Sequence, residues 1–332
     1  MNQLGLAYYV LRKVAENVLL LFFLAIAMFI LFRLVPADPV ATIVSPELSA
    51  EARERIIREW GLNQGIFGQL WHYLRGVFSL DLGQSFQYRR PVFEILSEKF
   101  LNTIVLVVPA VAIAAVGGLA LGLRAGLRPN GAADHLTLWM PPILRGIPPF
   151  WLGILLLMLF AYWLKLLPIG GMRSLGVPAE TFAQRYLTVD FLMHLVLPVL
   201  CLAITSLPEP VLLMRQSVRS VLRDDYIAYL GIRGLPESNL RKHVFWNSSL
   251  PVLTWVFHMF GYTLSTTIVI EIVFAWPGLG REMASAVLSY DYPLAQGCFF
   301  LIAIIVVGLN LVLDLIYPLI DPRISRPSEQ KT

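Results

Sequence analysis

The sequence predicts an all-α membrane protein whose helices cross the bilayer six times. Of the 332 residues, 57% are hydrophobic and only 14% are charged, whereas a soluble domain carries about 25% charged residues. Six apolar stretches are each long enough to cross a bilayer, which takes about 20 residues. These stretches are residues 14–35, 101–123, 137–161, 194–214, 252–275 and 295–318. Composition and stretch length together favour one helical membrane domain over two soluble ones.

The first apolar stretch follows a basic pair, Arg12 and Lys13. A signal peptide has the same order, but no convincing small-x-small cleavage site comes after this stretch. The stretch is also long enough to span. We therefore expect residues 1–13 to be a cytoplasmic segment and residues 14–35 to remain as the first span.

Residues 36–100 are too polar to enter the membrane, and their acidic and basic residues nearly balance. Ser45-Pro46 is typical of a helix start, and we expect that helix to continue through Trp60. Several glycines follow. The segment is predicted to be a small, mostly helical external subdomain, with a flexible loop as the alternative.

Residues 101–318 are expected to form the core, which holds the other five spans. The third span contains Arg145 and four prolines. Prolines inside a membrane helix indicate a kink or a packing site. In the last span, Asn310, Asp314 and Tyr317 share one helical face; helix packing is the favoured interpretation and an inner gate the other.

Basic residues are concentrated on one side of the predicted spans. They gather in the loop 215–251 and in the tail 319–332, whereas the short loop 276–294 contains only Arg281. The positive-inside rule therefore predicts that both termini are cytoplasmic.

Several functions are disfavoured by what the sequence lacks. The net charge is +4, but the basic residues are not interleaved with aromatic ones, so we expect no nucleic-acid partner. Cys201 and Cys298 lie in apolar stretches without ligand-type neighbours, so we expect inert thiols and no metal site. The phosphate-binding motif G-x-x-x-x-G-K-[ST] is absent, as are H-E-x-x-H and G-x-S-x-G. We therefore expect no enzyme activity in this chain.

The most informative segment is the predicted cytoplasmic loop 215–251. It is far longer than a simple helix connection requires, and residues 218–232 and 236–247 are both compatible with helices. Gly234 has the position of a helix C-cap, with Pro236 just beyond it. A helix–turn–helix here could dock into a partner protein; a basic, lipid-facing loop is the alternative.

The run DYIAYLGIRGL at 225–235, with the histidine and the NSSLP that follow, resembles the EAA loop of ABC importer permeases. It is most similar to the dipeptide, oligopeptide and nickel branch, whose loop reads DYxxxARAKGL, then H, then RNAxLP. Leu230 and Ile232 replace family alanines, and Trp246 stands where arginine is common. The residues carried over are Asp225, Tyr226, Tyr229, Gly231, Arg233, Gly234, Leu235, His243 and Asn247. The resemblance implies that this loop forms a coupling helix seated in a cleft of the ATPase.

Further motifs of the same branch occur in order along nearly the whole chain. They are VPADP at 35–39, LDLGQS at 80–85, RPV at 90–92, PFWLG at 149–153, HLVLP at 194–198, EIVFAWPGLG at 271–280 and DYP at 291–293. Each is weak by itself, but their order is specific. The resemblance implies a type I ABC importer permease fold, as a multi-pass protein of the cell inner membrane.

The resemblance also implies the partners and the cargo. These are a second homologous permease, two ABC ATPase subunits that hold ATP and Mg, an extracytoplasmic binding protein and the lipid bilayer. No cofactor is expected on this chain. Di- and oligopeptides are the expected substrates, and nickel or a metal–metallophore chelate is the alternative. An ion-coupled secondary transporter is a further alternative, although the paired broken helices typical of that class are not evident.

Four polar residues of the fifth span are candidates for lining a translocation path. Thr254, His258, Tyr262 and Ser265 are spaced four, four and three apart, which places them on one helical face. Hydrogen bonding between helices is the alternative role. Glu271, near the outer end of the same span, could shape the external mouth or make a structural hydrogen bond.

Overall fold

The computed structural model describes residues 3–34, 64–79, 81–177 and 179–320. Within these ranges all regular elements are helices, apart from one isolated bridge between Gln84 and Pro91. The predicted all-α class is confirmed. The helix expected after Ser45 and most of the tail 319–332 lie outside the described residues.

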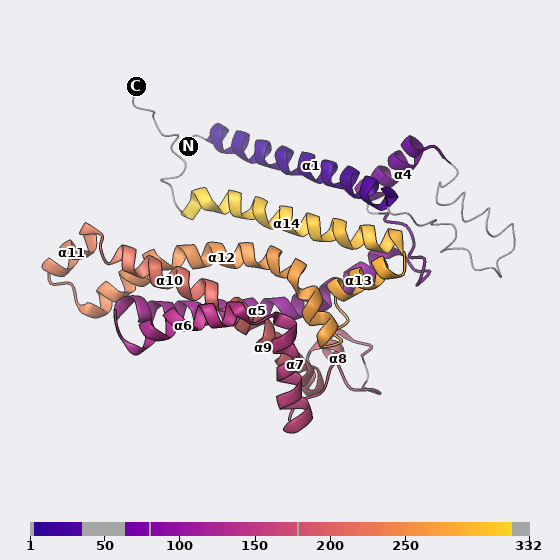
Figure 1. Cartoon of the computed structure of the whole chain (residues 1–332). Coiled ribbons are helices and arrows are strands. Elements are labelled where there is room, and N and C mark those ends of the chain that lie inside the picture. Colours follow the sequence, from indigo (N-terminus) through magenta and orange to yellow (C-terminus); the bar gives the residue numbers. More distant parts are fainter. Residues whose placement is uncertain (1–2, 35–63, 80, 178, 321–332) are drawn as a thin grey trace. The chain divides into compact units, whose positions relative to one another are not determined.

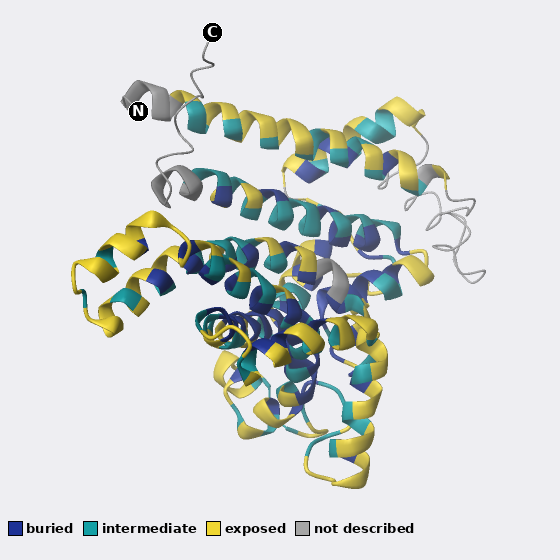
Figure 2. Ribbon diagram, turned by 60° about the vertical axis from the view of Figure 1, so that its left-hand side comes forward, coloured by how far each residue is buried: buried dark blue, intermediate teal, exposed yellow. Residues whose placement is uncertain are grey.

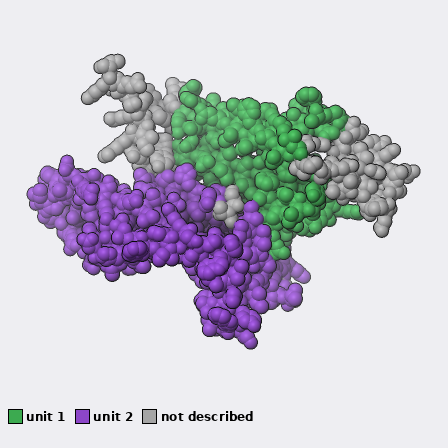
Figure 3. Space-filling view, viewed as in Figure 1, with its two compact units in different colours: residues 1–101, 278–332 green, residues 102–277 purple. Residues whose placement is uncertain are grey.

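The chain folds into two compact units, which Figure 3 colours separately. Unit 1 comprises residues 1–101 and 278–332, and unit 2 comprises residues 102–277. The helices of unit 1 are α1 (Gln3–Leu34), α4 (Ile66–Phe78), α13 (Leu279–Leu288) and α14 (Tyr292–Ile320). Those of unit 2 are α6 (Ala132–Gly146), α7 (Pro149–Leu156), the π-helix η1 (Leu157–Trp163), α8 (Phe182–Tyr186), α9 (Val189–Ser206), α10 (Pro208–Val221), α11 (Asp225–Ile232) and α12 (Glu237–Val273). Helix α5 (Val92–Leu127) contributes to both units.

In unit 1, α1 and α14 run side by side (Figure 1). Leu74 and Val77 of α4 are buried with Ala25 of α1 and Phe300 of α14. Most other side chains of α1 are exposed (Figure 2), as expected for a helix whose apolar surface faces lipid.

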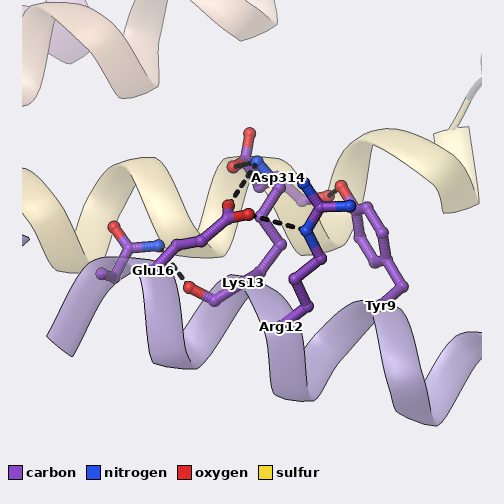
Figure 4. A network of polar contacts seen from close by, with 6 residues as sticks. Tyr9, Arg12, Lys13, Glu16 and Asp314 are labelled. Atoms are coloured by element: carbon purple, nitrogen blue, oxygen red, sulfur yellow. Dashed lines mark hydrogen bonds and ion pairs between the residues drawn. The ribbon is translucent and has the colours of Figure 1, made fainter. Parts of the chain in front are cut away.

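A polar network joins one end of α1 to α14 (Figure 4). The Lys13 ammonium lies 2.8 Å from the Asp314 carboxylate, and the Tyr9 hydroxyl donates to the backbone oxygen of Asp314 at 3.2 Å. Arg12 and Glu16 form a further ion pair along α1. For Asp314 these contacts favour helix packing over the gate interpretation.

Four helices are long and apolar enough to cross a membrane: Tyr8–Phe32 within α1, Val92–Leu127, Val189–Ser206, and Tyr292–Leu315 within α14. Two bent pairs pass the same test together. These are Ala132–Gly146 with Pro149–Trp163, bent by 95°, and Glu237–Thr263 with Thr267–Val273, bent by 58°. Six spans result in the described residues if each bent pair is one span.

The structure changes three of the predicted span boundaries, and prolines explain each change. Helix α5 begins at Val92, directly after Pro91, so the boundary expected at residue 100 falls inside a helix. The stretch 194–214 is divided between α9 and α10, because Pro208 starts a new helix at its first position. The third span breaks at Ile147, which is extended before Pro148 and Pro149.

Three glycines of α5, spaced four apart, allow α10 to approach its backbone closely. A Cβ at Gly118, Gly122 or Gly126 would stand 2.5 or 2.6 Å from the nearest α10 atom. Small residues at this spacing let two membrane helices pack backbone to backbone. Helix α10 is thereby held on α5.

Helix α12 ends at an unusual C-cap, because the residue with positive φ is an alanine. Ala275 has φ of 51°, and the N–H groups of Ala275 and Trp276 bond to the backbone oxygens of Ile272 and Glu271, which is a Schellman motif. An alanine pays a steric cost in the left-handed region that glycine does not.

We expect Ala275→Gly to stabilise the protein by about 1 kcal/mol, because the strain relieved exceeds the added flexibility of the unfolded chain. Thermal unfolding of the detergent-purified protein measures this gain. An unchanged or lowered midpoint would contradict the strain assigned to Ala275.

Candidate functional site

Helix α11 presents apolar side chains to the outside of unit 2. Tyr226, Tyr229 and Ile232 are 40%, 55% and 85% exposed; their spacing of three places them along one side of the helix. We call these three residues the docking surface. Burial, together with the Asp224 carboxylate, raises the pKa of the Tyr226 hydroxyl, so this side chain stays neutral at physiological pH.

A single buried residue fastens α11 to the rest of unit 2. Ile227 is buried in a cluster with Met214, Val218 and Val221 of α10 and Val244 of α12. The short turn from α10 to α11 is also ordered, since the N–H of Asp224 bonds to the backbone oxygen of Val221 at 3.1 Å. The docking surface therefore lies on a helix whose position is fixed by packing, and not on a free loop.

The end of α11 has the C-cap that the sequence predicts. Gly234 has φ of 76°, its N–H bonds to the oxygen of Gly231, and the N–H of Leu235 bonds to the oxygen of Leu230. This is a Schellman motif with glycine at the left-handed position. The Arg233 guanidinium lies over the Tyr229 ring, 5.3 Å from its centroid, which stabilises the ring's orientation.

The second helix expected over 236–247 is not a separate element. Helix α12 begins at Glu237, with Pro236 as its N-cap, and continues to Val273. The prediction ended the helix at Asn247, but Pro251 lies inside α12 and does not end it. His243 and Asn247 are exposed on its first turns, and the Asn247 amide donates to the His243 oxygen. Only residues 233–236 therefore separate α11 from the helix that contains the fifth span.

Sequence reasoning missed a buried ion cluster beside α11, made by α6 and α10. The Asp134 carboxylate lies 2.7 Å from the guanidinium groups of both Arg215 and Arg219. It also accepts from the Asn130 N–H at 2.9 Å. The sequence does contain a signal that could have predicted this cluster: an acidic residue in the first turn of a helix, and two arginines spaced four apart on another. The two arginines were interpreted only as determinants of orientation.

The path candidates of α12 occupy two different environments. His258 and Tyr262 are exposed and Thr254 is half-buried, with its hydroxyl bonded to the Leu250 oxygen. The side chain of Ser265 lies outside the described residues. The polar stripe is thus on an outward face of α12 for the residues that the structure describes, and its role as a path stays a prediction.

Glu271, by contrast, is fully buried within unit 2. Its carboxylate accepts a 2.6 Å hydrogen bond from the Thr103 hydroxyl. The neighbouring Asn102 accepts from the Tyr186 hydroxyl and donates to the Pro277 oxygen, and the Trp276 indole donates to the Asn102 oxygen. These contacts favour the structural-hydrogen-bond interpretation of Glu271, which joins α5 to the end of α12.

We expect Thr103→Val to lower the free energy of unfolding by about 1–3 kcal/mol, because a buried carboxylate loses a donor. Thr103→Ser retains the hydroxyl and is the matched control. Thermal unfolding in detergent compares the two. Equal midpoints for the valine and serine variants would contradict this role of the hydroxyl.

Comparison with known proteins gives a consistent result along the chain. Residues 118–326 match the family described as the binding-protein-dependent transport system inner membrane component, and residues 6–107 match its N-terminal counterpart. The glutathione transport system permease protein GsiC of Escherichia coli strain K12 is 31% identical over 317 residues, covering 95% of this chain and 98% of that protein. GsiC of Salmonella typhimurium strain LT2 is 32% identical with the same coverage. The oligopeptide transport system permease protein AppB of Bacillus subtilis strain 168 is 29% identical over 321 residues, covering 96% and 99%.

Proposed function

Because the chain belongs to the family of inner membrane components of binding-protein-dependent transport systems, we propose that it is a permease subunit of an ATP-driven importer for di- and oligopeptides. Family members are permease subunits and not enzymes. The chain pairs with a second, homologous permease, and the two form the translocation path between them. A binding protein delivers the substrate from outside, and two ATPase subunits with ATP and Mg act at the cytoplasmic face, where both termini lie.

The docking surface is the observation that carries the proposal. Three apolar side chains on a short helix are exposed to water in the isolated chain, which is costly unless a partner covers them. The helix is nevertheless fastened by Ile227, so its position is defined before a partner binds. A supported helix with an exposed aromatic face suits the cleft of an ATPase subunit, and aromatic residues are the usual anchors of such interfaces.

Transport follows from two states of the assembly. The inward- and outward-facing states of the path must differ in how strongly they bind the loaded binding protein and the ATP-bound ATPases. Closure of the ATPases moves α11, and α12, which begins at Glu237 and runs on into the fifth span, carries that movement to the membrane. The exposed polar stripe of His258 and Tyr262 offers hydrogen-bonding groups to a peptide backbone along the path.

Peptide is the favoured cargo because the similar permeases are named for glutathione, itself a short peptide, and for oligopeptides. A nickel or metallophore importer shares the same motifs and is the alternative outcome of the test.

The proposal is tested by uptake into proteoliposomes that hold this chain with its partner permease, ATPases and binding protein. Labelled dipeptides, glutathione and longer peptides are compared with nickel and a nickel chelate, each with and without ATP. We expect peptide uptake that requires both ATP and the binding protein. Uptake of the nickel chelate and not of peptides would identify a metal chelate as the substrate. Uptake driven by an ion gradient without ATP would overturn the assignment as an ATP-driven importer.

A further inference from the structure

The buried ion cluster of unit 2 connects α10, the helix on which α11 packs, to α6 of the third span. The Asp134 side chain is 4% exposed, and its partners Arg215 and Arg219 are 12% and 32% exposed. Arg215 and Arg219 lie one turn apart on α10, so two positive charges converge on one carboxylate of α6. Charged groups at this depth remain only where they are paired.

Helix α10 supports α11. The turn between them is closed by backbone hydrogen bonds, and Ile227 of α11 packs on Val218 and Val221 of α10. The glycine stripe holds the same helix against α5. Helix α11 is therefore packed on α10 as well as on α12.

Helix α6 packs on α10 and leads into the sharper of the two bent helix pairs. Asp134 lies in the first turn of α6, and at its other end the chain turns by 95° into α7. The Thr137 hydroxyl, which is also buried, bonds to the Asp134 backbone oxygen. The Asp134 carboxylate is thus held by the Asn130 N–H, just before α6, and by the two arginines of α10.

We propose that Asp134 is a positioning residue that makes the broken span α6–α7 follow the movement of α11, through Arg215 and Arg219. This inference rests on the proposed function, since it assigns a second route for the motion that the ATPases impose. The first route is the continuous chain from α11 into α12. The second passes through the ion cluster, so a single docking event moves the third and the fifth spans together.

The ion cluster is chemically suited to this role. Its two 2.7 Å contacts are directional and short, whereas apolar side chains can slide past one another at small cost. Charge-assisted hydrogen bonds fix the geometry of the groups that they join. The pairing therefore resists a change in register between α6 and α10 while both move as one body.

The decisive variant neutralises the whole cluster, because Asp134→Asn alone would leave two arginines without their counter-charge. The triple variant D134N/R215M/R219M removes all three charges and leaves none stranded. Glu94→Gln, which breaks the exposed Arg90–Glu94 pair, is the control. In the reconstituted importer, we expect the triple variant to keep its ATP hydrolysis but to import roughly tenfold less peptide per ATP, a typical size for coupling between sites. The control should match the parent.

A second measurement does not depend on transport. Spin labels are placed on the exposed residues Ala228 of α11 and Leu136 of α6, as A228C and L136C, while the native cysteines are buried. We expect one narrow distance distribution in the parent, unchanged by ATP, and a broadened or ATP-dependent one in the triple variant.

An equally narrow distance in the triple variant would overturn the proposal, whatever the uptake shows. So would a normal import-to-ATP ratio in that variant. If the parent importer takes up no substrate with ATP, the proposed function is contradicted. The distance measurement then tests the role of Asp134 by itself.

Discussion

Replacement of Gly122 by alanine is expected to destabilise unit 2 by about 1–3 kcal/mol or more, the usual cost of overpacking. The new Cβ would stand 2.6 Å from the Met214 Cβ, 2.7 Å from the Val211 oxygen and 3.0 Å from the Arg215 nitrogen. Carbon atoms at rest lie about 3.5–4.0 Å apart. Two of these three neighbours are backbone atoms, so no rotamer change relieves the clash, and α10 must move away from α5.

Gly308→Ala is the matched control, since a Cβ there has nothing within 4 Å. Removal of this glycine from the interior of α14 should raise stability by up to about 1 kcal/mol through helix propensity. Thermal unfolding in detergent should therefore shift in opposite directions for the two variants. A Gly122→Ala protein as stable as the parent would show that α5 and α10 do not need their close approach.

The sequence predicts the helical class and the six apolar stretches because both depend on local composition. It also predicts the helix C-cap at Gly234, because a glycine followed by Pro236 is a local signal for a helix end in the left-handed conformation. Span ends were less predictable. The window 194–214 is mostly apolar, but it contains Pro208 and Glu209, and the new helix α10 begins at Pro208.

Long-range pairs could not be predicted from local pattern. Asp134 and Arg215 are 81 positions apart, and nothing in either segment identifies the other. Glu271 is similar: its position near a span end left both an external mouth and a structural hydrogen bond open, and nothing in the local pattern identified Thr103 of α5 as the partner. The candidate docking residues were found because the motif is contiguous, yet the motif does not say which of its members face outward. Ile227 lies in the middle of that motif and is buried.

Loss of both tyrosines of the docking surface is expected to weaken binding of the ATPase pair by about 100-fold or more without unfolding the permease. An aromatic anchor at an interface is worth about 2 kcal/mol, or about 30-fold in affinity, although two anchors are not strictly additive. Tyr226 and Tyr229 are 40% and 55% exposed and lie outside the buried cluster that holds α11, so Y226A/Y229A leaves the Ile227 anchor in place. Pull-down of the purified ATPases by the detergent-solubilised permease, titrated with ATPase, measures the loss.

Two further variants separate docking from folding. Tyr162→Ala removes a tyrosine near the end of η1 that is 69% exposed, and it should leave ATPase binding unchanged. Ile227→Ala removes the buried anchor of α11 and should lower stability by about 2–5 kcal/mol, as large-to-small changes in a core do. The two kinds of residue on α11 therefore predict different results. The tyrosine variant should lose ATPase affinity and keep its stability, whereas the Ile227 variant should lose stability. If Y226A/Y229A binds the ATPases as the parent does, the partner does not bind at α11, and the exposed residues His243 and Asn247 at the start of α12 become the next surface to test.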